Sequence, residues 1–166
     1  MAEENQPAQG QAEGRAQEQQ FSIQKLYLKD VSFESPNSPA VFADGEWKPE
    51  INIQLNSSNK SIGQDTYGVD LKITVTAKQN KKTAFLVELT QSGIFTVAGF
   101  EQDNLRGMLG AYCPETLFPF AREAIAELIS KGGFPPLLLA PVNFNALYMQ
   151  QAQQQQAAAA AQDTAH

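Results

Sequence analysis

Apolar and polar residues alternate along four stretches of the chain, the pattern produced by a β-strand with one buried face. These stretches span 21–34, 50–56, 66–78 and 82–98. In the last two, one face carries apolar side chains only: Val69, Leu71, Ile73, Val75, Phe85, Val87 and Leu89. Short turns between the later strands favour an antiparallel meander. Gly93 predicts a bulge or bend in the last strand.

Strict alternation sorts the side chains of the first stretch into two faces. One face would hold Phe21, Ile23, Tyr27, Val31 and Phe33. The other would hold Leu26, Leu28, Asp30 and Glu34, and it would continue on the fourth strand with Leu86 and Glu88. This second face mixes apolar with acidic side chains, so it is either a solvated sheet face or a binding surface.

Helical spacing follows the strands. A first segment has its apolar residues at 105, 108, 109 and 112, and Pro114 is expected to end or kink it. A second helix is predicted from Glu115 to Lys131, where Gly132 and Gly133 stop it. Its apolar stripe is wider than one sheet face would cover, and it consists of Leu117, Phe118, Ala121, Ala124, Ile125, Leu128 and Ile129. We therefore expect a second subunit to cover part of it, with the oligomer interface at Leu117, Ala121, Ile125 and Leu128; ordinary burial within one subunit is the alternative.

Two long loops are unusually apolar. The loop 35–49 carries Phe42 and Trp47, and the segment 132–143 places three prolines among large apolar side chains. Prolines prevent a regular helix there, and the apolar run is shorter than the ~20 residues that span a bilayer. We interpret both loops as lining a groove that stays open to a partner; simple capping of the core is the alternative.

Composition divides the chain into three parts. Residues 1–20 form a flexible acidic N-terminal tail and residues 21–149 a single domain. Residues 150–166 form a Gln/Ala-rich C-terminal tail that is helical or disordered. Before this tail, Asn143 is a predicted N-cap, and Phe144, Leu147 and Tyr148 share one helical face.

Charge and cysteine content limit the possible partners and locations. The formal net charge of −6 disfavours nucleic acid and favours a basic protein or peptide as a partner. One cysteine permits no internal disulfide, and the N-terminus lacks an apolar signal region. We therefore expect a cytoplasmic location.

The sequence gives little support to catalysis, and carboxylates brought together by the fold are the one alternative left open. The single histidine is His166, the last residue, where nothing would hold it in place as a base. Cys113 is best interpreted as a small buried apolar residue. One cysteine and one terminal histidine cannot build a zinc site, and no phosphate-binding glycine motif is present. We expect no catalytic residue, no cofactor and no metal.

Several long segments resemble one known family. The similar segments read GAYCPETLFPFARE (110–123), GGFPPLLLAPVNFNALY (132–148), YLKDVSFESPNSPAVF (27–42), Trp47 to Pro49, and TAFLVELTQSGIFTVAG (83–99). Together they are similar to the signature segments of the SecB family of bacterial protein-export chaperones. The resemblance extends from about Phe21 to Met149, with Asn145 where relatives commonly carry Asp.

This resemblance implies an α+β fold with a four-stranded antiparallel sheet followed by two helices, assembled as a homotetramer that is a dimer of dimers. It also implies an ATP-independent holdase that binds unfolded precursor proteins, keeps them translocation-competent and delivers them to the SecA motor ATPase. Contact with a membrane would occur only indirectly, through the translocase.

Residues can be carried over from the family to each role. The client-binding groove would be lined by Phe42, Trp47, Phe134, Leu137, Leu139, Phe144 and Tyr148. SecA would dock on Asp30, Glu34, Leu86 and Glu88. Two alternatives stay open: a small α+β enzyme for an acyl or aromatic substrate, and a structural subunit of a fixed complex.

Overall fold

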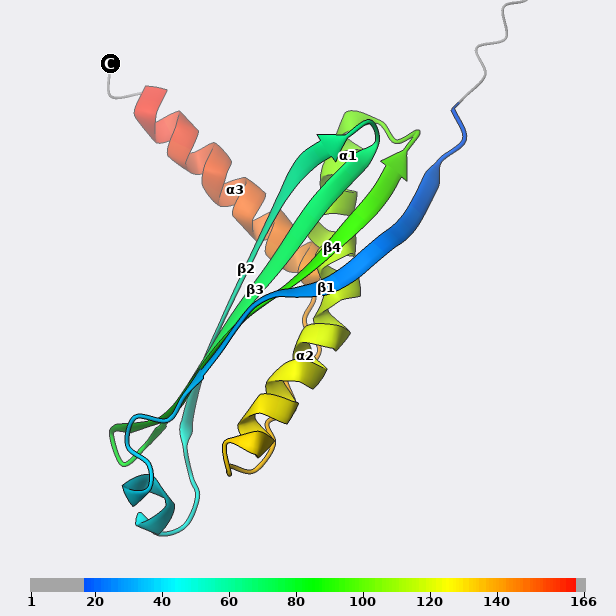
Figure 1. Cartoon of the computed structure of the whole chain (residues 1–166). Helices are drawn as coiled ribbons and strands as arrows, with labels where there is room; N and C mark the ends of the chain where they lie inside the picture. The colour runs from blue at the N-terminus through cyan, green and yellow to red at the C-terminus, as the bar shows by residue number, and fades with distance from the viewer. Residues whose placement is uncertain (1–16, 164–166) are drawn as a thin grey trace, which may run out of the picture.

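The computed structural model describes residues 17–163, and the greater part of the predicted N-terminal tail lies outside them (Figure 1). The strands are β1 (Gln20–Glu34), β2 (Glu50–Gly63), β3 (Thr66–Gln79) and β4 (Lys82–Ala98). A short 3₁₀-helix, η1 (Ala40–Ala43), lies in the loop between β1 and β2. The helices are α1 (Gln102–Gly107), the π-helix η2 (Met108–Tyr112), α2 (Cys113–Lys131) and α3 (Phe144–Asp163).

The four strands form one antiparallel sheet in the order β1-β4-β3-β2. The predicted meander is therefore correct only for β2, β3 and β4. The long loop 35–49 carries the chain from β1 to the opposite edge of the sheet, so β1 pairs with β4. Strand β2 also extends past residue 56 to Gly63, because pairing with β3 continues where its own side chains are polar.

Two β-bulges in β1 change which side chains share a face. Gln24 and Lys29 are each an extra residue opposite β4, between Ile23 and Lys25 and between Leu28 and Asp30. Each extra residue reverses the alternation. The predicted faces are therefore wrong for three residues: Leu26 and Leu28 point to the helix-bearing face of the sheet, and Tyr27 points to the outer face.

Helix α2 packs on one face of the sheet, mainly over β4 and β3 (Figure 1). The apolar residues predicted for that face of β3 and β4 are all buried, as are Leu117, Ile125 and Ile129 of the helix. Gly93 forms no bulge in β4, so that part of the prediction is wrong. Its missing side chain instead leaves room for the ring of Phe95 and for Leu117.

The chain remains helical from Gln102 to Lys131, so Pro114 does not end the first helix. A π-helical turn at Met108–Tyr112 connects α1 to α2, and Pro114 falls in the first turn of α2. Proline is tolerated in a first turn because the missing N–H is not needed there.

Helix α3 begins after Asn143, whose Oδ1 accepts a hydrogen bond from the Ala146 N–H at 2.9 Å, which confirms the predicted N-cap. The helix extends through the Gln/Ala-rich stretch to Asp163. Figure 1 shows its far end projecting clear of the sheet.

Candidate functional site

One helix cannot cover the whole helix-bearing face of this sheet. Four strands spaced ~4.8 Å apart are about 19 Å wide, whereas a helix is roughly 10 Å across. Because α2 lies over the two central strands, apolar side chains of both edge strands stay exposed. On β1 these are Ile23, Leu28 and Val31, and on β2 they are Ile51 and Ile53. We call these two sets the β1 strip and the β2 strip.

An aromatic cluster lies where the loop 35–49 meets the end of α2. The Phe134 ring centroid lies 5.0 Å from Phe42, 5.3 Å from Trp47 and 5.1 Å from Phe85. Phe134 is buried, Trp47 is half-buried, and Phe42 is 52% exposed. The cluster therefore joins both apolar loops and presents Phe42 to solvent.

The segment 132–143 returns along α2 without forming helix or strand after residue 134. Phe134 near its start is held by a hydrogen bond from its N–H to the Ile129 carbonyl. Past its end, the Phe144 ring packs 5.5 Å from Phe118, near the beginning of α2. Leu139 between them is buried, whereas Leu138 is 76% exposed. An extended chain alternates its side chains, so one side of this segment seals the core and the other faces solvent.

The predicted client-groove residues therefore separate into two groups. Phe134, Leu139 and Phe144 are core residues, and their assignment to an open groove is corrected because each packs inside the fold. Phe42, Trp47, Leu137 and Tyr148 keep accessible surface. Sequence reasoning left Leu138, Ile51 and Ile53 out of the groove. The alternation of Ile51 and Ile53 was visible in the sequence, but their position on an edge strand, which leaves them exposed, follows only from the strand order.

The predicted oligomer interface needs a similar correction. Leu117, Ala121 and Ile125 are each 0% exposed because the chain's own sheet covers them, and Leu128 is half-buried. The apolar side chain that α2 leaves open is Phe120, which is 45% exposed. Phe120 and Leu28 line the same hollow between α2 and β1.

The predicted docking residues Asp30, Glu34, Leu86 and Glu88 all lie on the outer face of the sheet. Glu34 stands directly opposite Leu86, and Glu88 lies opposite Ser32 on the same pair of strands. The Lys72 ammonium is 3.9 Å from the Glu88 carboxylate, a loose and exposed pair. Pairing of β1 with β4 thus brings these four residues from distant parts of the chain into one patch.

A tighter charge cluster is found beside this patch. The Asp70 carboxylate accepts hydrogen bonds from Lys29 and from the Ser92 hydroxyl, both at 2.6 Å. Partial burial raises the pKa of the Asp70 carboxyl, but the hydrogen bonds from Lys29 and Ser92 outweigh it and hold that pKa below its usual value. Asp70 therefore stays ionised on the outer face, where it forms an ion pair with Lys29.

Chemical groups for catalysis are not assembled in the described part of the chain. Burial raises the pKa of the Cys113 thiol to about 12, so this cysteine stays protonated and unreactive near neutral pH. No group of three potential metal-binding side chains comes together among residues 17–163. Within the same range, no helix is both long and apolar enough to cross a membrane.

Comparisons with known proteins give a consistent result. The family described as "Preprotein translocase subunit SecB" matches residues 14–155. The Protein-export protein SecB of Nitrosococcus oceani is 55% identical over 163 residues, covering 98% of both chains. The protein of the same name from Methylococcus capsulatus is 52% identical over 153 residues, covering 92% of both.

A solved structure has the same fold. It is a SecB-like chaperone of Mycobacterium tuberculosis in complex with a peptide from an antitoxin. It superposes with a TM-score of 0.60 at 14% identity and covers 74% of this chain and 90% of its own. The small-enzyme alternative is therefore set aside: this chain belongs to the SecB family of protein-export chaperones.

Proposed function

We propose that non-native precursor proteins bind along the β2 strip and the exposed edge of the aromatic cluster, and that the chain then passes them to SecA. The observation that carries this proposal is the row of apolar side chains that α2 leaves uncovered on β2. Ile51 and Ile53 lie in that row, and Phe42 and Leu138 add exposed apolar surface in the two loops. Unfolded proteins expose the same kind of surface, and apolar contact does not require a particular sequence.

The binding energy of such a surface is moderate. Burying one Ile, Leu or Phe side chain stabilises a complex by about 1.5–3 kcal/mol, and ordering of the client offsets much of the sum. Several weak contacts along one client chain nevertheless reinforce one another through effective concentration. The chain would therefore hold clients without ATP and release them by competition.

SecA is the proposed acceptor, and its docking surface is the outer-face patch Asp30, Glu34, Leu86 and Glu88. A basic segment of the acceptor suits two exposed carboxylates on β1 and a third on β4. Because this patch lies on the opposite face of the sheet from the β2 strip, client and acceptor can bind at once. We place this exchange in the cytoplasm.

We further propose that the chain assembles as a homotetramer, a dimer of dimers, in which the β1 strip and Phe120 are covered by other copies. Exposed apolar side chains on both β1 and α2 support this assignment. The two strips would then have different occupants: other copies on the β1 side, and clients on the β2 side.

Capture of a permanently unfolded protein, reduced and carboxymethylated α-lactalbumin, tests the client site. Ile53→Asp with Leu138→Asp should weaken binding in calorimetry by roughly tenfold or more, since two apolar contacts are lost. The matched control is Asn52→Asp with Gln54→Asp, which adds two carboxylates to the outer face of the same strand. Equal weakening by both pairs would contradict the assignment of the β2 strip.

The acceptor site is tested separately. Asp30→Lys with Glu88→Lys should abolish binding of SecA and leave capture of the unfolded protein intact. Loss of both activities, or of neither, would contradict the division between two faces. Purification with one fixed partner, and no capture of the unfolded protein, would instead favour a structural subunit.

A further inference from the structure

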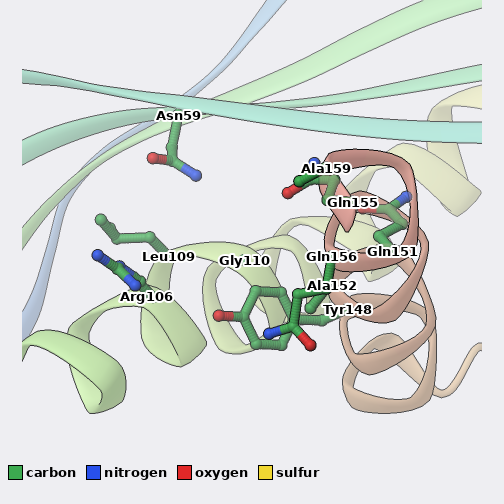
Figure 2. Close-up of a pocket in the computed structure, with 10 residues that line it drawn as sticks. All are labelled: Asn59, Arg106, Leu109, Gly110, Tyr148, Gln151, Ala152, Gln155, Gln156 and Ala159. Atoms are coloured by element: carbon green, nitrogen blue, oxygen red, sulfur yellow. The ribbon is translucent and has the colours of Figure 1, made fainter. Parts of the chain in front are cut away.

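Strand β2 borders hollows on both faces of the sheet. Figure 2 shows Asn59 pointing from β2 into the hollow that α3 and the α1–η2 segment enclose on the helix-bearing face. Alternate side chains of a strand point to opposite faces, so the neighbouring Ser58 and Lys60 belong to the outer face. A second hollow, of about 370 Å³, lies on the outer face and is lined by both of them.

The outer hollow is centred on Gly68 of β3. Gly68 pairs with Lys60 of β2 on one side and with Ile94 of β4 on the other, and its missing side chain leaves the space between them open. The Ile62 side chain, which is 47% exposed, and Tyr27 of β1 complete the apolar part of the lining. The hollow can therefore receive an apolar side chain beside a lysine.

The charged groups around the hollow are three lysines and one aspartate. Lys29 forms an ion pair with Asp70 at 2.6 Å, so these two charges offset each other. Lys60 lines the hollow, and Lys25 lies next to it on β1, opposite Ile94. Within residues 17–163, neither Lys25 nor Lys60 forms an ion pair with a carboxylate. Two exposed positive charges are therefore available to a partner.

The outer face thus carries opposite charges at its two ends. The docking patch holds three carboxylates, and Lys25 and Lys60 lie at the other end of the same strands. From Glu88 to Ile94 strand β4 advances six residues, about 20 Å at ~3.4 Å per residue. Lys72, between the two ends, is already loosely paired with Glu88. One extended segment of six or seven residues could contact both ends.

The charge of the whole chain determines which partner suits this hollow. With a formal net charge of −6, the chain repels a segment that carries only acidic residues. A segment that also carries basic residues would be attracted to the docking patch, which would bring its acidic residue to the lysines. Reversal of such a segment would place like charges against each other at both ends, so only one orientation along the sheet is favoured.

We propose that the outer hollow, which we call the basic hollow, binds an acidic residue and an adjoining apolar side chain of the same acceptor segment that docks on the patch. The proposal rests on the docking surface proposed above and extends it. The acceptor segment then has basic residues at one end and an acidic residue about six positions away. The docking patch supplies attraction, and the basic hollow supplies orientation and selectivity.

Three fluorescent peptides of ten residues test the basic hollow on the full chain. The first has three lysines, a spacer of five Gly and Ser residues that ends in Leu, and two glutamates. In the second the glutamates are glutamines, and in the third the Leu is Ser. The first should bind roughly three- to tenfold more tightly than either of the others, as expected of two exposed ion pairs or one apolar contact.

The sign of the glutamate effect is decisive. A more acidic peptide should bind an acidic chain less tightly unless a basic site receives it. Stronger binding of the first peptide than of the second therefore supports the basic hollow, and this advantage should shrink as salt is added. Equal binding of the first peptide and either of the others, or weaker binding of the first, would overturn it.

Variants locate the gain. Lys25→Gln with Lys60→Gln should remove the advantage of the first peptide over the second. The matched control is Lys78→Gln with Lys82→Gln, which removes the same charge at the other end of β3 and β4 and should retain the advantage. An equal effect of both pairs would overturn the basic hollow. A lowered native mass in Lys25→Gln with Lys60→Gln would show that these lysines contact another copy, and the proposal would be wrong.

Two further outcomes separate this proposal from the docking surface on which it rests. If none of the three peptides binds, the docking patch fails and the basic hollow fails with it. If the second peptide binds and the first has no advantage, only the basic hollow is rejected. Loss of the advantage in millimolar inorganic phosphate, at constant ionic strength, would assign the lysines to a small anion and would also reject the proposal.

Discussion

The ring of Tyr148 occupies the space that a side chain on Gly110 would need. A Cβ placed on Gly110 would lie 2.5 Å from Cδ2 of Tyr148, far inside van der Waals contact. Gly110 belongs to the π-helical turn, so this contact fixes α3 to the α1–α2 helical segment.

Gly110→Ala is expected to lower the free energy of unfolding by about 1–3 kcal/mol, because the added methyl group overpacks the Tyr148 ring. Helix propensity alone would give a gain of ~1 kcal/mol for the same change. The sign of the effect, measured by urea unfolding, therefore distinguishes the two contributions.

Gly107→Ala provides the matched control, since no atom lies within 4 Å of a Cβ placed there. It should leave stability unchanged or raise it by up to ~1 kcal/mol. Adding Tyr148→Ala to Gly110→Ala should relieve the overpacking. Equal stabilisation by Gly107→Ala and Gly110→Ala would show that the ring does not pack there.

The members of the aromatic cluster should contribute unequally to the free energy of unfolding. Phe134→Ala is expected to lower the free energy of unfolding by about 3–5 kcal/mol, as buried aromatic truncations do. Phe42→Ala, at an exposed position, should change it by less than about 1 kcal/mol. Unfolding can be followed by the fluorescence of Trp47, the one tryptophan of the chain, because its ring centroid lies 5.3 Å from that of Phe134. Similar losses for the two variants would mean that Phe134 is not the buried member.

Asp70 should make stability depend on pH at the acidic end. Its pKa in the folded chain is held below the ordinary value of 3.8. A carboxyl with a lowered folded-state pKa contributes stability above its unfolded pKa and loses that contribution as the pH falls below it. Asp70→Asn should therefore flatten the fall in urea-unfolding stability below about pH 4.

Ser92→Ala tests the cause of this shift. It removes one of the two hydrogen bonds to the Asp70 carboxylate, so the Asp70 pKa measured by NMR titration should rise. Ser32→Ala, on the neighbouring strand, is the control and should leave it unchanged. An Asp70 pKa that stays low in Ser92→Ala would assign its lowering to the lysines Lys29 and Lys60.

The proposed tetramer depends on Phe120. Phe120→Glu places a charge in the apolar surface shared with the β1 strip, so the native mass should fall to that of a smaller assembly. Ser130→Glu adds the same charge at an exposed position of the same helix and should leave the mass unchanged. An unaltered mass in both variants would remove Phe120 from the interface.

Much of the central sheet could be predicted because β3 and β4 lie under α2, and their side chains alternate regularly over 69–77 and 85–89. Strand β1 could not, because its bulges fall at Gln24 and Lys29, ordinary polar residues that give no local signal. In the proline-rich segment, Leu138 and Leu139 are chemically identical. Their different burial is set by the path of the chain along α2, which composition does not encode.

The residues of the proposed docking patch share one face, as predicted, despite this error, because Asp30 and Glu34 lie beyond both bulges. The exposed apolar surface of α2 was not predicted correctly. A wide apolar stripe on α2 suggested two neighbours, but β3 and β4 cover its centre by themselves, and the exposed Phe120 lies outside the stripe.

The two bulges of β1 act as a compensating pair. Deleting either Gln24 or Lys29 alone would reverse the side-chain alternation of all residues on one side of the deletion. Phe21 or Phe33 would then point to the outer face of the sheet. Removing both would restore the faces of the two ends of the strand but exchange those of its middle, moving Tyr27 to the helix-bearing face and Leu26 and Leu28 to the outer face. Insertions and deletions within this strand should therefore be tolerated among homologous genes only in matched pairs.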